Sequence, residues 1–326
     1  MPRERTVSEL CLHPAAGRRG VTVIELVLVL AIGGLVAAVA TRTFRVQQRS
    51  IGTAVELAEL RTQLRLGVHL LATELRTIAP HQGDVHSWGG TGITIRSVNG
   101  TSVVCSRESD SALVLPPLDR EHDPSPTSWM TYPQPGDSVR VLDDSLGVSG
   151  IDDVWRSYEI ADLSPAARVG ECALRTASTD STHTPVRVRL AGGARLPATV
   201  VTGASVRFFR PVRYELYRSG DGLWYLGASE CRAGRSPSCS TIQPVAGPYD
   251  APGAGTGSGL QLVYLDQSGS ELLPDRDDPR RIARIDVTVR SRVRTPPVWR
   301  HTGMRAAGDS IHLSVAPRYP VSARRE

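Results

Sequence analysis

An uninterrupted apolar run near the start of the chain most strongly limits how this protein can fold. Residues 21–40 read VTVIELVLVLAIGGLVAAVA, and Glu25 is their only charged residue. At about 1.5 Å per residue, a helix of this length covers about 30 Å, which matches the hydrocarbon thickness of a bilayer. We therefore predict a membrane-spanning helix over residues 21–41.

The residues that flank this run distinguish it from a secretory signal peptide. A secretory signal has a shorter apolar core, followed by small residues at its cleavage site. Here Arg18, Arg19 and Gly20 precede the apolar run, and no such cleavage site follows it. This order predicts that residues 1–20 are a removable leader and that the apolar helix stays on the mature chain.

Glu25 needs a specific explanation, because an ionised carboxylate in hydrocarbon is costly without a partner. A cut after Gly20 would give Val21 a cationic amine. Glu25 of one subunit would then pair with the Val21 amine of its neighbour, and burial would make each charge depend on the other. The alternative is that Glu25 only reaches back to the membrane interface. That alternative leaves the preceding Arg-Arg-Gly sequence unexplained.

The segment from Arg19 to Leu26, RGVTVIEL, resembles the class III signal of type IV prepilins and pseudopilins. That signal combines a basic leader, a glycine at the cut, an apolar first mature residue and a glutamate at the fifth position. The resemblance implies that a prepilin peptidase cleaves after Gly20 and N-methylates Val21, and that Glu25 forms an assembly salt bridge. Val21 departs from the phenylalanine or methionine most common in the family, but it is also apolar.

The resemblance also implies partners, and the charges imply a location. The expected partners are the prepilin peptidase, other pilin or pseudopilin subunits, the inner-membrane assembly platform and membrane lipid. Basic flanks favour the cytoplasmic side of a membrane, and four arginines precede the span: Arg3, Arg5, Arg18 and Arg19. We therefore expect a single-pass inner-membrane protein with a periplasmic C-terminal domain, which later enters a pilus or pseudopilus.

The helix is predicted to continue beyond the membrane and to end before Pro80. Apolar residues recur there at spacings of three or four, as expected for one face of an amphipathic helix. They are Leu57, Leu60, Leu64, Val68, Leu71, Leu75 and Ile78. The predicted helix, residues 21–79, thus has a membrane-spanning first half and a second half that packs on a globular domain.

After Pro80 the apolar period changes to two, which indicates strands. The expected strands are residues 93–98, 101–105, 112–115, 138–142, 186–190, 205–210, 214–218, 223–226, 260–265, 282–289 and 311–315. Asn99-Gly100 and residues 219–222 are predicted hairpin turns, and residues 119–135 and 246–259 are predicted surface loops. The expected fold class is α+β, with the long N-terminal helix packed on a β-rich domain of residues 80–326.

Four cysteines follow the predicted leader: Cys105, Cys172, Cys231 and Cys239. In a periplasmic domain they would form two disulfides, and four cysteines allow three connectivities. Cys231 and Cys239 lie close together in a stretch rich in Gly, Ser and Pro, which favours their pairing and leaves Cys105 for Cys172. A four-cysteine zinc site is the competing interpretation, and the chain lacks a C-x-x-C pair for it.

A second resemblance concerns the distal part of the chain. Residues 262–269 (LVYLDQSG) and 281–289 (RIARIDVTV) resemble the closing strands of W-type minor pilins and of J-type minor pseudopilins of type II secretion. Residues 64–78 are similar to the helix end of the same proteins. Major pilins are usually much shorter than this chain, so these resemblances imply a minor component.

Other classes of protein find less support in the sequence. The net charge is +5, but the basic residues are scattered arginines, with no lysine, so we expect no nucleic-acid binding. His81, Asp84 and His86 are interpreted as a solvated loop rather than a metal site. The aspartates at 143, 144, 152, 153, 275, 277 and 278 do not match the ligand spacing of an EF-hand. No H-E-x-x-H or G-x-S-x-G motif occurs, and we expect no metal, no cofactor and no enzyme activity.

The leading functional hypothesis is therefore a structural one, a minor pilin or pseudopilin subunit that assembles into a type IV pilus or a type II secretion pseudopilus, or primes it. The alternative is a filament-tip binding module on the same scaffold: an adhesin, a DNA-uptake protein or a receptor for secretion substrates. A distinct exposed aromatic or basic patch would favour that alternative. A membrane-anchored enzyme would need a convergent polar pocket with a catalytic constellation.

Overall fold

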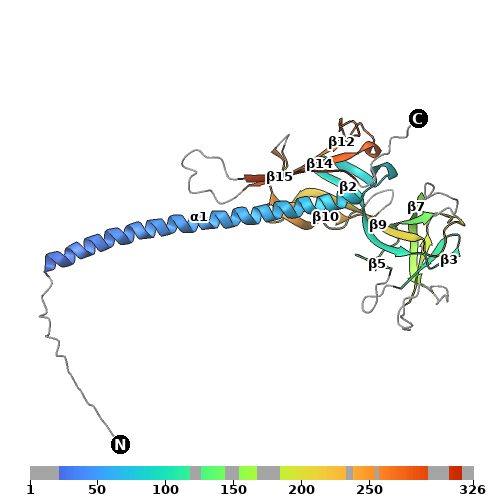
Figure 1. Ribbon diagram of the computed structural model, residues 1–326, viewed down its shortest axis with the longest axis horizontal. Helices are drawn as coiled ribbons and strands as arrows, with labels where there is room; N and C mark the ends of the chain where they lie inside the picture. The colour runs from blue at the N-terminus through green and yellow to red at the C-terminus, as the bar shows by residue number, and fades with distance from the viewer. Residues whose placement is uncertain are drawn as a thin grey trace, which may run out of the picture. The chain divides into compact units, whose positions relative to one another are not determined.

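The structure, a computed structural model, describes residues 22–117, 126–143, 154–166, 184–232, 238–253, 257–292 and 308–317. It confirms the α+β class, with one long N-terminal helix and a large antiparallel β domain (Figure 1). Contacts divide the chain into two compact units. One unit holds the helix up to Ala54, and the other begins at Val55 and holds the described strands.

Helix α1 (Val23–Thr77) is continuous over 55 residues. It stops just before Pro80, which begins the short 3-10 helix η1 (Pro80–Gln82). The backbone of Ala79 has left the helical region, at φ −120° and ψ 87°, as expected for a residue that precedes proline. The predicted apolar stripe is buried from Leu60 to Ile78, which confirms that the second half of α1 packs on the β domain.

The described strands form an 11-stranded and a 4-stranded sheet, and all their pairs are antiparallel. The strands are β1 (Val85–Gly89), β2 (Gly92–Val103), β3 (Ser106–Ser109), β4 (Ala112–Leu115), β5 (Ser128–Trp129), β6 (Ser138–Asp143), β7 (Val154–Pro165), β8 (Val186–Leu190), β9 (Ser205–Arg218), β10 (Trp224–Glu230), β11 (Gln243–Tyr249), β12 (Leu260–Leu265), β13 (Glu271–Leu272), β14 (Arg284–Arg292) and β15 (Gly308–Val315). The larger sheet has the order β1-β2-β9-β6-β7-β8-β4-β3, with β10 on β9, β11 on β10 and β5 on β2. The smaller sheet has the order β13-β12-β14-β15, and η3 (Pro279–Arg281) precedes β14.

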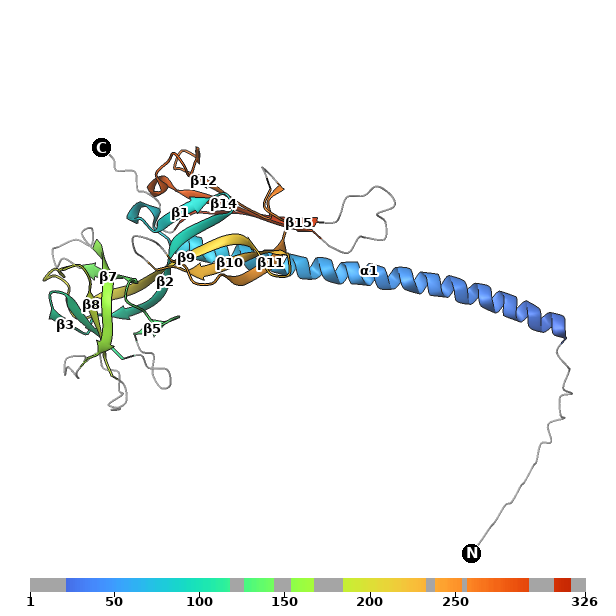
Figure 2. The ribbon, with the colours of Figure 1, turned by 180° about the vertical axis from the view of Figure 1, so that it is seen from behind.

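Two long strands, β2 and β9, run through both halves of the β domain (Figures 1 and 2). Along one edge, β9 pairs first with β6, through Phe209, and then with β10, from Val212 onward. Pro211 lies where this neighbour changes, a position at which a residue without an N–H is tolerated. Strand β9 therefore serves two hydrophobic cores: Phe208 packs in one, and Tyr214 packs in the other, together with α1 and the smaller sheet.

The predicted hairpin at Asn99-Gly100 is wrong, because β2 continues through these residues. Its partner β9 is long enough to pair with both halves, and Asn99 is the extra residue of a β-bulge between Val98 and Gly100. Gly100 does not have the positive φ that a type I′ turn requires. It allows close approach instead, since a Cβ there would lie 2.3 Å from Trp129 Cδ1.

Two other turn and loop predictions have different outcomes. The hairpin at residues 219–222 is confirmed, because β9 and β10 pair on either side of it. The loop at 246–259 is wrong in its first part, where residues up to Tyr249 belong to β11. The loop at 119–135 likewise contains the short strand β5. Strand β11 pairs with the preceding strand β10, and β5 pairs with β2, and the composition of these two stretches did not reveal either pairing.

The interpretation of Asp84 as part of a solvated loop is also wrong. Its side chain is 1% exposed and lies between two arginines. Asp84 Oδ1 accepts a hydrogen bond from Arg96 Nη1 at 3.1 Å and forms an ion pair with Arg140. Its Oδ2 accepts a hydrogen bond from the backbone N–H of Ala79 at 2.8 Å. The carboxylate thus links the segment that follows α1 to strands β2 and β6.

Candidate functional site

The first half of α1 exposes an apolar surface along its described length. From residue 22 to residue 54, every side chain that the structure describes is exposed. The large apolar ones are Val23, Ile24, Leu26, Val27, Leu28, Val29, Leu30, Ile32, Leu35, Val36, Val39, Phe44, Val46 and Ile51. By length and composition, α1 is able to cross a membrane.

Glu25 lies in the first turn of α1 and is exposed among these apolar side chains. Its backbone N–H donates to the carbonyl oxygen of Thr22 at 3.1 Å and to Thr22 Oγ1 at 3.3 Å. Thr22 thereby caps the helix start. A carboxylate in the first turn interacts favourably with the positive end of the helix dipole. The structure therefore places the Glu25 carboxylate at the exposed N-terminal end of α1.

Two of the predicted site residues cannot be located. Gly20 and Val21, the predicted cleavage and methylation positions, lie outside the described residues. Their predicted roles remain predictions.

The disulfide between Cys231 and Cys239 is confirmed. It links the end of β10 to the start of the segment that leads into β11, and the two residues also form an isolated β-bridge. Cys105 is buried and is also disulfide-bonded. Cys172, its predicted partner, lies outside the described part of the chain.

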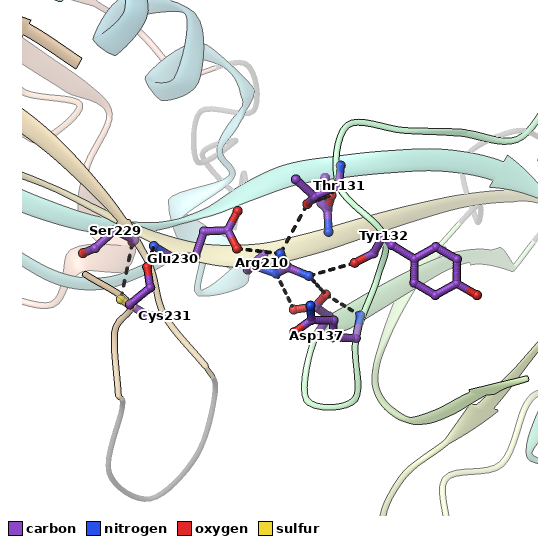
Figure 3. A network of polar contacts seen from close by, with 10 residues as sticks. Thr131, Tyr132, Asp137, Arg210, Ser229, Glu230 and Cys231 are labelled. Carbon is purple, nitrogen blue, oxygen red and sulfur yellow. Dashed lines mark hydrogen bonds and ion pairs between the residues drawn. The ribbon is translucent and has the colours of Figure 1, made fainter. Parts of the chain in front are cut away.

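The sequence did not reveal a polar cluster around Arg210 of β9 (Figure 3). Arg210 Nε and Nη2 donate to the two carboxylate oxygens of Asp137 at 2.9 Å and 2.7 Å. Arg210 Nη1 donates to Glu230 Oε2 at 2.7 Å, and Nη2 also donates to the Tyr132 carbonyl oxygen at 3.1 Å. The hydrogen bonds with Asp137, followed by the charges of Asp137 and Glu230, raise the pKa of Arg210.

This cluster lies beside a cleft of about 550 Å³ in the β domain. Arg210 occupies the same face of β9 as Phe208 and Val212, so an apolar strand face is interrupted by one charge. An arginine at an inward-facing position of a predicted strand was the one sequence feature that could have indicated this cluster. Its partners come from distant segments, so the sequence offered no means of pairing them.

Comparisons with protein-family models, with curated proteins and with solved structures found no match to this chain.

Proposed function

We propose that this chain is a minor pilin or pseudopilin subunit, which a prepilin peptidase cleaves after Gly20 and N-methylates at Val21. It would then assemble into a type IV pilus or a type II secretion pseudopilus. In this proposal the chain is a structural subunit and not an enzyme. The observation that carries the proposal is the contrast between the two halves of α1: one half is apolar and exposed wherever its side chains are described, and the other buries one face against the β domain.

Such a contrast is expected of a helix whose first half moves from a lipid bilayer to an interface with the helices of other subunits. Exposed apolar surface costs about 25 cal/mol per Å² in water, so a long apolar helix requires a cover. A bilayer supplies that cover before assembly, and the helices of neighbouring subunits supply it afterwards. Gly33 and Gly34 lie in this half of α1, and small residues of this kind allow membrane helices to approach each other closely.

In this proposal Glu25 fixes the position of one subunit along the filament relative to its neighbour. Within hydrocarbon its carboxylate seeks a cation, and the methylated amine of Val21 on a neighbouring subunit is the cation that processing would create. The arginines before Gly20 would keep the leader in the cytoplasm, so the β domain would be periplasmic.

The experiment that tests the proposal is the intact mass and N-terminal sequence of the protein isolated from its native membrane. A mature chain that begins at N-methylated Val21 is the expected result. A chain that still begins at Met1, or that begins beyond residue 40, would contradict prepilin processing.

A second candidate function is a filament-tip binding module on the same scaffold. The cleft beside Arg210 supports it as a candidate binding site, although its carboxylates differ from the aromatic or basic patch expected from the sequence. In that case the processing would be the same, and the β domain would also hold a ligand. The chemistry of the cleft indicates which ligand.

A further inference from the structure

The cleft beside Arg210 lies between the end of α1 and strands β2, β9 and β10. The residues that matter for its chemistry are Glu74, Asn99, Met130, Arg210, Tyr214 and Glu230. They come from five separate segments, and all belong to the same compact unit.

Negative charge exceeds positive charge in this cleft. Arg210 is the only cation among its lining residues, and its guanidinium is already bound by Asp137 and Glu230. Glu74 adds a third carboxylate, whose Oε2 accepts a hydrogen bond from Ser97 Oγ at 2.6 Å. Among the described residues no cation pairs with Glu74. Of these three carboxylates only Glu74 and Glu230 line the cleft, so together with Arg210 the lining carries one uncompensated negative charge, in a chain whose net charge is +5.

A buried donor without a partner lies in the wall of the same cleft. Asn99, the bulge residue of β2, is 5% exposed. Its Oδ1 accepts hydrogen bonds from Thr131 N–H at 3.2 Å and from Thr131 Oγ1 at 2.7 Å, which fixes the orientation of the amide. Its Nδ2 has no partner among the described residues. Buried donors are rarely left unsatisfied, so an acceptor oxygen is the group that this position lacks.

Apolar side chains form the remainder of the lining. Met130 is 76% exposed at the rim, and Val212, Tyr214 and Ala228 line the cleft further along. Burial and the nearby charge of Glu74 raise the pKa of Tyr214, which therefore stays neutral. Such a surface suits the aliphatic stem of a long cationic side chain, while the carboxylates bind its head.

We propose that this cleft binds an arginine or lysine side chain that a partner protein presents on an extended segment. Glu74 and Glu230 bind the cationic head, and Met130 covers the stem. An acidic peptide or a nucleic acid would be repelled by the same charges. This inference does not depend on cleavage or on filament assembly.

The test uses the full chain in lipid nanodiscs and two short peptides of glycine and serine, one with a central arginine and one with citrulline in its place. Citrulline keeps the shape of arginine but lacks its charge. In calorimetric titration, the arginine peptide is expected to bind at least about tenfold more tightly than the citrulline peptide, and added salt is expected to weaken its binding.

Variants of the lining residues test whether the peptide binds in this cleft. Glu74→Gln is expected to weaken arginine-peptide binding about tenfold, while Glu271→Gln, which removes an exposed carboxylate of β13 outside the cleft, should leave it unchanged. Glu230→Gln provides a second variant in case Glu74→Gln alters folding, which thermal unfolding would reveal. Equal binding of the two peptides, no binding of the arginine peptide up to about 10 mM, or unchanged binding by both folded cleft variants would overturn the proposal.

Discussion

Single carboxylates in this protein have roles that depend on what surrounds them. Asp84 is buried between Arg96 and Arg140, and removing one member of such a buried group is far more costly than removing an exposed ion pair. Glu74 faces a cleft without a cationic partner among the described residues. Glu25 is exposed on an apolar helix, where only a membrane or a neighbouring subunit would make its charge costly. The same side-chain chemistry thus contributes to folding at Asp84, and it would contribute to binding at Glu74 and to assembly at Glu25 if the two proposals hold.

The prediction at the scale of single residues concerns Glu25. Glu25→Ala is expected to reduce incorporation into filaments at least about tenfold, because the amine of a neighbouring subunit would lose its partner at a cost of several kcal/mol. Cleavage of the leader should be unaffected. Immunoblots of membrane and filament fractions measure both outcomes.

The matched control for this change is Glu59→Ala, which removes an exposed carboxylate from the second half of the same helix. This variant should be incorporated normally. Normal incorporation of Glu25→Ala would remove the role proposed for Glu25.

At the scale of elements, the contact between α1 and β11 depends on a glycine. A Cβ at Gly67 would lie 2.1 Å from Tyr249 Oη, and that hydroxyl donates a hydrogen bond to the Gln63 carbonyl oxygen at 2.9 Å. Burial raises the pKa of Tyr249, so the hydroxyl keeps its proton. Gly67 therefore allows the tyrosine to bind the helix backbone directly.

Gly67→Ala is expected to lower the free energy of unfolding by about 1–3 kcal/mol, because the added methyl group displaces Tyr249. This loss should occur although alanine has the higher helix propensity. Urea unfolding of the full chain in nanodiscs, followed by tryptophan fluorescence, measures it.

Gly52→Ala is the control, because a Cβ at Gly52 meets no atom within 4 Å. It should cause no loss of stability. A Gly67→Ala variant as stable as Gly52→Ala would contradict the close packing described for α1 and β11.

At the scale of the whole molecule, ion pairs connect elements that are distant in sequence. Arg61 of α1 donates from Nε to Asp309 Oδ2 of β15 at 2.8 Å. This hydrogen bond, followed by that from the Ser310 N–H, lowers the pKa of Asp309 below its usual value of 3.8. Because the folded pKa is the lower one, the stabilisation is fully present above the unfolded pKa and is lost as the pH falls through the folded pKa.

We therefore expect Asp309→Asn to lower the free energy of unfolding at pH 7 and to lower it less at about pH 2, where the native carboxyl is protonated to a greater extent. The difference is expected to be small, since the pair is partly exposed to solvent. Urea unfolding at both pH values measures it. Asp275→Asn, at an exposed position, should show no such dependence, and an equal effect of Asp309→Asn at both pH values would contradict the ionic origin.

Local patterns predicted several features correctly. The stripe from Leu60 to Ile78 follows from the helical period, and Pro80 ends the helix through its own backbone restriction. The hairpin at residues 219–222 and the disulfide between Cys231 and Cys239 join residues that are close along the chain. In each case the interacting residues lie within a few turns or one short loop, so the information is present in a short stretch of sequence.

The sequence by itself determined the long helix, its division into an exposed apolar half and a buried amphipathic half, and the change to strands after Pro80. Only the tertiary structure decided that β2 continues through Asn99, because that depends on the length of β9 and on the approach of Trp129. It also decided that Asp84 is buried and that Glu74, Arg210 and Glu230 share a cleft. Periodicity reports the neighbours of a residue along the chain, whereas bulges, buried ion pairs and clefts depend on partners brought close by the folding of distant segments.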